Sequence, residues 1–382
     1  MKLIDVCELI VDCPHSTAKD EGQGIPLVRT PNIGKGRLEL SDVHRVSEAV
    51  YNQRIERAVP QAGDLILARE APVGNVALIM SGQKVCLGQR VVLIRPDKEK
   101  ADPAYLTYYL LSEEVQHRLK NNANGAVVAH LNMNEIRNLV IELPEISIQK
   151  RIASFLSSLD DKIALNNRIN HNLEEQVQER FNALIAEDNG AGFCQLSDVI
   201  DVNPSRKLSK NTTARCIEMS YLSTNGPFPS GWEYKEYNGG MKFINGDTIM
   251  ARITPCLENG KVAYINFLDS NEVGFGSTEY IVLRSKEQLP SEFTYFLARN
   301  PDFVDYAVKN MNGSSGRQRV SSDSIAKYII PSISSDSIQS FSEIAKPAMA
   351  IIRTNCLENR SLVETRDTLL PALMKGRFPC NN

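Results

Sequence analysis

Apolar and polar residues follow two different periods along this chain, and the change of period marks its parts. Short runs rich in β-branched residues, bounded by Gly, Pro, Asn or Asp, recur in each half of the chain and predict β-strands. Two long stretches, 148–185 and 337–378, space their apolar residues mostly by three, four or seven positions, which predicts long helices. We therefore expect two mixed regions of strands and short helices, each followed by a helical arm.

The same order of sequence blocks is written twice. A Gly-Asp turn leads into an apolar strand ending in Arg, as AGDLILAR (62–69) and again as NGDTIMAR (245–252). The following pairs are GNVALI (74–79) and GKVAYI (260–265), LGQRVVLIR (87–95) and FGSTEYIVLR (275–284), LTYYLLS (106–112) and FTYFLAR (293–299), and NNANGA (121–126) and NMNGSS (310–315). Two unrelated domains would not keep this order, so the pattern favours a tandem duplication. The second copy also holds Asn300-Pro301, which predicts a break between two short helices.

The two arms carry apolar seams that are long enough for a coiled coil. The positions expected to pack the arms together or to dock a partner are Ile148, Ile152, Phe155, Leu159, Ile163, Asn166, Leu173, Val177, Leu184, Ile338, Phe341, Ile352, Asn355, Leu362, Leu369 and Leu373. The polar members, Asn166 and Asn355, are candidates to set the register of an antiparallel pair. Pro347 lacks an N–H, which predicts that a helix starts or is kinked there. The alternative is that each arm packs only on its own domain.

Such a pair has a length that suits DNA. A helix of about 38 residues is about 57 Å long, which matches about 17 base pairs. An antiparallel pair would hold two similar domains at a fixed separation. Reading a two-part DNA site requires this spacing, because half-site separation mirrors protein geometry.

Composition narrows the setting of the protein. The 382 residues suffice for two or more domains. No apolar run approaches the ~20 residues that a membrane span needs, and acidic residues interrupt the opening stretch MKLIDVCELIVDC, unlike a secretory leader. The eight cysteines are scattered, which indicates reduced thiols and a cytoplasmic location. The net charge of −3 excludes a histone-like polycation, so DNA binding would depend on positioned contacts.

Several stretches are similar to a known family. LPEISIQKRIASFLSSLDDKIALNNRINHNLEEQ (143–176) resembles the central conserved region of the specificity subunits of type I restriction-modification systems. FSEIAKPAMAII (341–352) and LVETRDTLLPALMKGRF (362–378) resemble their distal conserved region, and AGDLILAREAPVGNVALI (62–79) with its second copy resembles the core of their target-recognition domains. VDCPHSTAKDEGQGIPLVRTPNI (11–33) is similar to a common opening of a first such domain. The distal arm matches the central arm only loosely, which leaves open whether both dock partners in the same way.

The resemblance implies an α+β fold with pseudo-twofold symmetry. Two target-recognition domains, 1–144 and 190–331, would be joined and spaced by helical arms at 145–189 and 332–378 that form an antiparallel coiled coil, followed by a tail at 379–382. Each domain would read one half of a bipartite double-stranded DNA site. The arms would fix the spacer and dock two methyltransferase subunits, which use S-adenosylmethionine to methylate adenine N6. Restriction subunits would join and cut DNA with ATP and Mg, while this chain binds no cofactor and is not catalytic itself.

The residues themselves offer little chemistry. VNPSR (202–206) lacks the second Pro and the aromatic residue of an adenine methyltransferase motif, and GFG (274–276) is no cofactor fingerprint. There is no GxxxxGK[ST] for a nucleotide-driven motor. PDKEK (96–100) has the letters of a nuclease motif, but it crowds its acids into one turn. Cys7, Cys13 and His15 lack the paired spacing of a zinc site, so no metal is expected.

Candidate DNA contacts lie in polar loops, since bases are read by polar side chains and phosphates bind Arg, Lys and backbone N–H groups. In the first domain they are His15, Ser16, Thr17, Arg29, Asn32, Lys35, Arg90, Asn124 and His130. In the second they are Ser205, Arg206, Lys207, Asn225, Ser277, Thr278, Ser314, Arg317, Gln318 and Arg319. The loop GSSGRQR (313–319) is the foremost candidate, although it also suits a mobile surface loop. Arg69 and Arg252 recur in both copies, which fits a shared structural role as well as a DNA contact.

Two other hypotheses remain open. The chain could be a coiled-coil scaffold whose domains bind proteins and do not read DNA. A self-contained restriction-modification enzyme is the third possibility, and the absence of its motifs argues against it.

Overall fold

The computed structural model describes residues 1–41, 43–121, 130–186, 192–314 and 316–375. The chain forms two compact units, which we call unit 1 (Met1–Lys162 with Ser361–Asn382) and unit 2 (Ile163–Arg360). Two long helices, α5 (Ile146–Ala186) and α10 (Ser335–Met374), contribute residues to both units. The division therefore cuts through the two expected arms, because each helix packs in a different unit at each of its ends.

Unit 1 contains two sheets. The larger has the strand order β1 (Cys7–Asp12), β8 (Val91–Pro96), β5 (Leu65–Ala68), β6 (Val76–Leu78) and β3 (Gly36–Arg37). The smaller has the order β4 (Arg45–Val46), β2 (Ile25–Val28) and β7 (Cys86–Leu87), in which β2 and β7 are parallel. The short helical elements are η1 (Leu3–Val6), η2 (Thr30–Asn32), α1 (Glu48–Arg54), α2 (Pro103–Leu111), α3 (Glu113–Asn121) and α4 (Met133–Arg137).

Unit 2 is built in the same way. One sheet has the order β10 (Ile200–Val202), β17 (Tyr280–Ser285), β14 (Asp247–Ala251) and β15 (Val262–Tyr264). Another has the order β12 (Glu233–Glu236), β11 (Thr213–Ile217), β16 (Gly274–Gly276) and β13 (Met241–Phe243), with β11 and β16 parallel, and β9 (Phe193–Gln195) pairs with β18 (Ile329–Pro331). The short helical elements are α6 (Leu196–Val199), η3 (Met219–Tyr221), α7 (Phe293–Arg299), α8 (Pro301–Lys309) and α9 (Ser322–Ala326).

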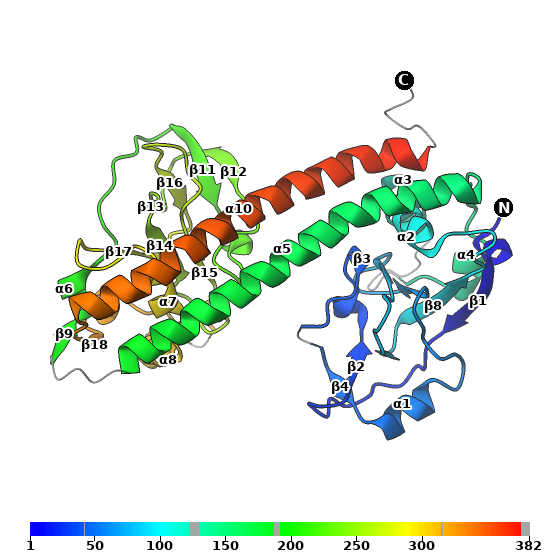
Figure 1. The fold of residues 1–382 in the computed structure, drawn as a ribbon, viewed down its shortest axis with the longest axis horizontal. Coiled ribbons are helices and arrows are strands. Elements are labelled where there is room, and N and C mark those ends of the chain that lie inside the picture. The colour runs from blue at the N-terminus through cyan, green and yellow to red at the C-terminus, as the bar shows by residue number, and fades with distance from the viewer. Residues whose placement is uncertain (42, 122–129, 187–191, 315, 376–382) are drawn as a thin grey trace. The chain divides into compact units, whose positions relative to one another are not determined.

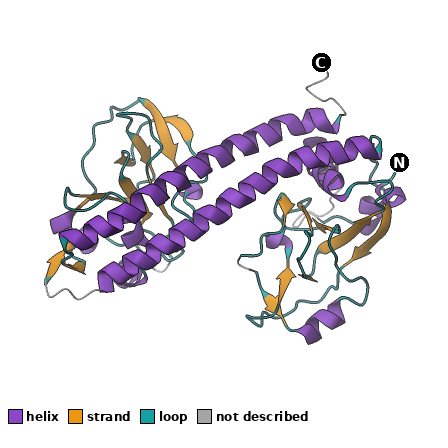
Figure 2. Ribbon diagram, in the orientation of Figure 1, coloured by secondary structure: helices purple, strands orange, loops and turns teal. Residues whose placement is uncertain are grey.

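The two units share one topology. The order β1-β8-β5-β6 in unit 1 matches β10-β17-β14-β15 in unit 2, and the parallel pair β2–β7 matches β11–β16. Figures 1 and 2 show each set of strands with its short helices beside the long ones. This repetition confirms the expected α+β class with a tandem repeat and long paired helices.

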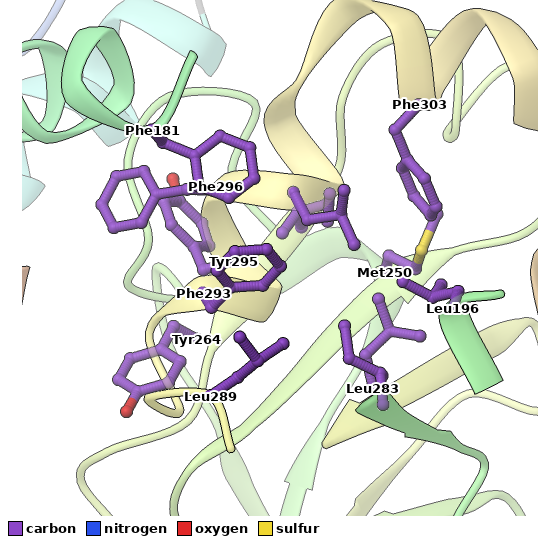
Figure 3. Close-up of a cluster of buried hydrophobic side chains, with 14 of the residues drawn as sticks. Phe181, Leu196, Met250, Tyr264, Leu283, Leu289, Phe293, Tyr295, Phe296 and Phe303 are labelled. Carbon is purple, nitrogen blue, oxygen red and sulfur yellow. The ribbon is translucent and has the colours of Figure 1, made fainter. Parts of the chain in front are cut away.

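The core of unit 2 joins both long helices to the sheet. Phe181 of α5 lies with its ring centroid 4.9 Å from that of Phe293 in α7 and 5.9 Å from that of Phe341 in α10. Figure 3 shows Phe181, Phe293 and Phe296 gathered to the left of the strand residues Met250 and Leu283. Because these aromatic side chains are almost fully buried, they supply a large share of the hydrophobic stabilisation of this unit.

The core of unit 1 repeats this plan with aliphatic residues. Ile152 and Leu156 of α5 are fully buried in one cluster with Leu106 of α2 and Val92 of β8. Leu373, near the end of α10, belongs to the same cluster and is 2% exposed. Both long helices are thus part of the core of each unit.

The long helices run antiparallel where they meet. In unit 1, Arg366 Nη1 donates to Asp160 Oδ1 at 2.7 Å. In unit 2, Asn166 Nδ2 donates to Asn359 Oδ1 at 2.9 Å and Asn355 Nδ2 donates to Asn170 Oδ1 at 2.8 Å. Partner numbers fall along α10 as they rise along α5, which confirms the antiparallel pairing. The alternative, in which each arm packs only on its own domain, is wrong because the two helices also bond to each other.

The seam differs in detail from the expected one. Phe155 is 43% exposed, and its neighbour Leu156 is buried instead. Polar residues fill further seam positions, among them Asp160 and Asn170. Phe155 therefore does not pack the two helices together, and its expected alternative role in docking a partner stays a prediction.

Of the other expected seam residues, Ile152, Asn166, Val177, Leu184, Phe341, Ile352 and Leu373 are buried, and Ile148, Leu159, Ile163, Leu173, Ile338, Asn355, Leu362 and Leu369 are partly buried.

Pro347 neither starts nor ends a helix, contrary to one expectation. It lies inside α10, and its ring is exposed, so water can solvate the carbonyl that loses its N–H partner. Among the helices of the described residues, none combines the length and the hydropathy needed to cross a membrane.

Candidate nucleic-acid interface

A buried ion pair occupies the same place in the sheet of each unit. Asp64 of unit 1 is fully buried and accepts hydrogen bonds from Arg95 Nε at 2.7 Å and Nη2 at 2.8 Å. Asp247 of unit 2 is fully buried and accepts from Arg284 Nε at 2.5 Å. Burial raises the pKa of the Asp247 carboxyl, an effect that the Arg284 guanidinium opposes. These pairs account for the Asp of the two Gly-Asp turns and for the Arg that ends LGQRVVLIR and FGSTEYIVLR. They also show which positions of the two units are equivalent.

Charged side chains of unit 1 gather around Arg69, which follows β5. This cluster lies at the end of β5 opposite to the Asp64–Arg95 pair. Arg69 is 6% exposed, and its Nε donates to the Leu131 carbonyl at 2.8 Å. Its Nη1 donates to Asp12 Oδ2, at the end of β1, at 2.7 Å. The exposed His15 lies with Nε2 at 3.0 Å from the same carboxylate oxygen. The Arg69 guanidinium is therefore neutralised inside the protein.

A chain of contacts leads from Arg69 to the surface. Arg69 Nη2 lies 2.6 Å from His130 Nε2, and His130 Nδ1 lies 2.6 Å from Glu70 Oε1. Because arginine can only donate, His130 Nε2 accepts and its Nδ1 carries the proton that Glu70 accepts. Glu70 Oε2 is 3.0 Å from Nε of Arg90, whose side chain is 52% exposed. Both ring nitrogens of His130 are thus used within the protein, and Arg90 is the cation that remains accessible.

Unit 2 carries different charges at the corresponding strand ends. Arg319 donates to Glu279 through Nε and Nη2 at 2.7 to 2.9 Å. Its Nη1 donates to the Arg317 carbonyl at 2.9 Å. Arg319 and Asn312 exchange two backbone hydrogen bonds of 2.9 Å, which close the loop that sequence reasoning favoured. Ser277 Oγ accepts from the Glu279 N–H at 3.1 Å, so the loop before β17 belongs to the same cluster.

The structure brings some expected contacts together. His15, Arg90 and His130 meet around Arg69, while Ser277 and Arg319 meet around Glu279. The exposed candidates are His15, Ser16, Thr17, Lys35, Arg90, Ser205, Lys207, Asn225, Thr278, Ser314 and Arg317, and the partly buried ones are Arg29, His130, Arg206, Ser277, Gln318 and Arg319. Asn124 lies outside the described residues.

Other candidates serve the protein itself. Asn32 is 5% exposed, and its amide accepts from the Arg29 N–H at 3.1 Å and donates to the Glu39 carbonyl at 3.3 Å. This side chain holds its own loop and is not available to a base. Arg206 Nη2 lies 3.6 Å from Asp247 Oδ1. Arg206 therefore sits at the start of β14, a strand length of roughly 17 Å from the Arg319 cluster.

Sequence reasoning missed the carboxylates of both clusters. Asp12, Glu70 and Glu279 do not suit contact with DNA phosphates, so a search for cations and amides passes over them. One signal was available in the aligned blocks, since LGQRVVLIR has Arg90 where FGSTEYIVLR has Glu279. A charge that reverses between two copies of one domain indicates that the copies differ in their contacts.

Comparisons with known proteins agree on one family. The model of the type I restriction modification DNA specificity domain matches residues 1–175. The HindI specificity subunit of Haemophilus influenzae is 20% identical over an alignment covering 83% of this chain and 86% of that protein, and the MjaIX specificity subunit of Methanocaldococcus jannaschii is 22% identical over 99% and 92%. The chain is similar to type I restriction enzyme specificity subunits, by the family model over residues 1–175 and by these two relatives over most of its length.

The relatives differ in how much of their own length the match to this chain covers. A putative MjaX specificity subunit of Methanocaldococcus jannaschii is 26% identical over 45% of this chain, but the match covers only 38% of that protein. Among solved structures, the S subunit from M. genitalium has a TM-score of 0.60 at 14% identity, covering 100% of this chain and 96% of that one. This likeness extends the shared fold to both units.

Proposed function

We propose that this specificity subunit reads a bipartite DNA sequence, one half-site through each unit. The observation that carries the proposal is that the two units share a strand order but differ in side chains at equivalent strand ends. A common framework with different polar side chains at one place is what two half-sites of different sequence require. The scaffold hypothesis gives no reason for clusters of arginine and carboxylate side chains to lie at the same strand ends in both units and yet to differ in composition.

The paired helices α5 and α10 set the spacing of the half-sites in this proposal. Each contributes core residues to both units, and the bonds between Asn166, Asn170, Asn355 and Asn359 fix their register. A buried amide pair in a helix seam favours one register over others. Half-site separation would then follow from the helix pair.

The partners in this proposal are two methyltransferase subunits and the restriction subunits. The methyltransferase subunits would dock on the helical pair and use S-adenosylmethionine to methylate adenine N6, and the restriction subunits would use ATP and Mg. The specificity subunit itself supplies recognition and no chemistry. Its exposed apolar side chains on the long helices, such as Phe155, Ile344 and Ile351, support docking of other subunits there.

Deleting the gene in its host tests the proposal. We expect one bipartite N6-methyladenine motif to disappear from the methylated sites of the genome and to return when the gene is restored. An unchanged methylation pattern, together with no salt-dependent duplex binding by the purified chain with its methyltransferase subunits, would favour the scaffold hypothesis. Methyl transfer to DNA by the purified chain alone would contradict a non-catalytic role.

A further inference from the structure

Arg69 and Arg252 occupy the same place in their units. The Arg69 N–H donates to the Arg90 carbonyl, and the Arg252 N–H donates to the Glu279 carbonyl. The Arg69 carbonyl accepts from the Leu131 N–H, and that of Arg252 accepts from the Val320 N–H. These bonds make position 90 equivalent to 279 and position 131 equivalent to 320, so His130 corresponds to Arg319.

The partners that neutralise Arg69 have no counterparts in unit 2. Asp12 lies opposite Val92 in β8, and extending the register of β10 and β17 places Pro204 at its position. Glu70, which follows Arg69, corresponds to Ile253, which follows Arg252. Both acidic side chains of the unit 1 cluster are thus replaced by residues without charge.

Glu279, the acidic residue of the unit 2 cluster, already pairs with Arg319. Glu279 binds Arg319 through three hydrogen bonds of 2.7 to 2.9 Å, so its charge is matched by that arginine. Within the described residues, the Arg252 side chain makes no hydrogen bond or ion pair, and its Nε is buried without a partner. A buried donor without a bond destabilises the folded state. An uncharged side chain at 252 would avoid that cost, which indicates that the cation serves contact with something outside the chain.

Further polar groups stand beside Arg252. The Thr254 N–H donates to the Gln318 carbonyl at 3.1 Å, and Ile253 forms a β-bridge with Arg319. The loop that carries the exposed Arg317 is thus tied to the strand end that carries Arg252. Arg252 and Arg317, whose guanidinium groups have no carboxylate partner among the described residues, lie on joined segments. This arrangement favours a phosphate.

We propose that Arg252 binds a backbone phosphate of DNA in unit 2, whereas its equivalent Arg69 holds unit 1 together. This inference rests on the proposed function, and it assigns different tasks to an arginine that the duplication copied. Arg252 and Arg317 contact phosphate, and Arg319 is positioned by Glu279 beside them. Such contacts position the unit on DNA and add affinity that is independent of sequence.

Matched substitutions in the full chain, assembled with its methyltransferase subunits, test the inference. Arg252→Met, Arg252→Lys and Arg69→Met are compared with the wild type for thermal unfolding and for binding of a fluorescent duplex between about 50 and 200 mM salt. Arg168→Met, which removes an exposed charge from α5, controls for a general loss of positive charge. A duplex with the recognised site and one of random sequence are both used.

We expect Arg252→Met to keep or raise the wild-type Tm and to lose about tenfold in affinity for both duplexes. In Arg252→Met the slope of log affinity against log salt should decrease in magnitude by about 0.9, the value for one phosphate contact. Arg252→Lys keeps the charge, so it should retain most of the wild-type slope. Arg69→Met should instead lower the Tm by roughly 5 °C or more, with an unchanged slope below its Tm. Wild-type affinity and slope in Arg252→Met, or an equal loss in Arg168→Met, would overturn the inference. A wild-type complex that binds neither duplex would contradict the proposed function, and this inference with it.

Discussion

Asp160 places a carboxylate inside the helix pair, where a coiled-coil seam ordinarily holds an apolar side chain. It is 6% exposed and accepts hydrogen bonds from Tyr108 Oη at 2.6 Å and from Arg366 Nη1 at 2.7 Å. Burial, together with the charge of Asp160, raises the pKa of Tyr108 far above its ordinary value, so the phenol stays a donor. The two donors offset the desolvation of the carboxylate.

Removing this carboxylate leaves Arg366 without its buried partner. We expect Asp160→Ala to lower the free energy of unfolding by about 3–5 kcal/mol, measured by urea denaturation. The neighbouring Asp161, whose side chain is 64% exposed, is the matched control, and Asp161→Ala should leave the urea midpoint nearly unchanged. Equal midpoints for the two variants would show that the buried pair adds nothing.

Cys356 gives the helix pair of unit 2 a pH dependence in the alkaline range. Burial, with a smaller effect of the Glu174 charge, raises the pKa of its thiol from 9.0 to about 11. Because the folded-state pKa is the higher one, the stability that the protonated thiol contributes is complete below pH 9 and is lost as pH rises towards 11. We expect the wild type to lose about 2 kcal/mol or less relative to Cys356→Ala over this window, in urea titrations at a series of pH values. Parallel pH profiles of the two proteins would contradict this assignment.

The role of a charged residue depends on partners that its own sequence neighbourhood does not reveal. Arg69 and Arg252 end equivalent strands in similar blocks, yet Asp12 neutralises Arg69, while Arg252 has no such partner in the part of the chain that the structure describes. Asp12 lies 57 residues from Arg69 and is brought to it by the pairing of β1 with β8. The duplicated sequence blocks therefore predicted where the clusters lie. Only the fold shows which arginines are paired with a carboxylate.

At the scale of elements, the hydrogen bond between Asn170 and Asn355 helps to hold the two long helices in register. Asn170→Leu would leave the Asn355 amide without its partner, and we expect a loss of about 1–3 kcal/mol in the free energy of unfolding. Asn170→Leu/Asn355→Leu should recover most of this loss, because two apolar residues suit the seam. A double-mutant cycle in urea measures the coupling, and strictly additive losses would mean that the two amides do not interact.

Apolar periodicity predicted the extent of both long helices closely. The seam at 148–185 became α5 at Ile146–Ala186, and the Asn300-Pro301 break lies between α7 and α8, where the Asn300 side chain caps α8. Which residues form the buried face was less predictable near Phe155, where Leu156 is buried instead. Amides and carboxylates occupy buried positions there and beyond because residues of the other helix, far away in sequence, supply their hydrogen bonds.

At the scale of the whole molecule, the two units should be separable in what they read. We expect Arg90→Ala to weaken discrimination in one half of the methylated motif by roughly 10- to 100-fold at a contacted base, and to leave the other half unchanged. Arg317→Ala is the matched change in unit 2, and it should weaken binding to all sequences more evenly. Sequencing of methylated sites in hosts that carry each variant measures both effects. A change in both half-motifs by Arg90→Ala would contradict the assignment of one half-site to each unit.

The asparagine bonds also bear on the ancestry of the chain. A shift of 189 positions carries the start of α5 onto the start of α10, and it carries Asn166 onto Asn355 and Asn170 onto Asn359. The pairs Asn166–Asn359 and Asn170–Asn355 are therefore copies of one pair. A polypeptide of half the length, with a single such helix, would already hold both asparagines and could pair with a second copy of itself. Its homodimer would recognise a palindromic DNA sequence. Gene fusion would then have allowed the two halves to diverge in sequence and to recognise different half-sites.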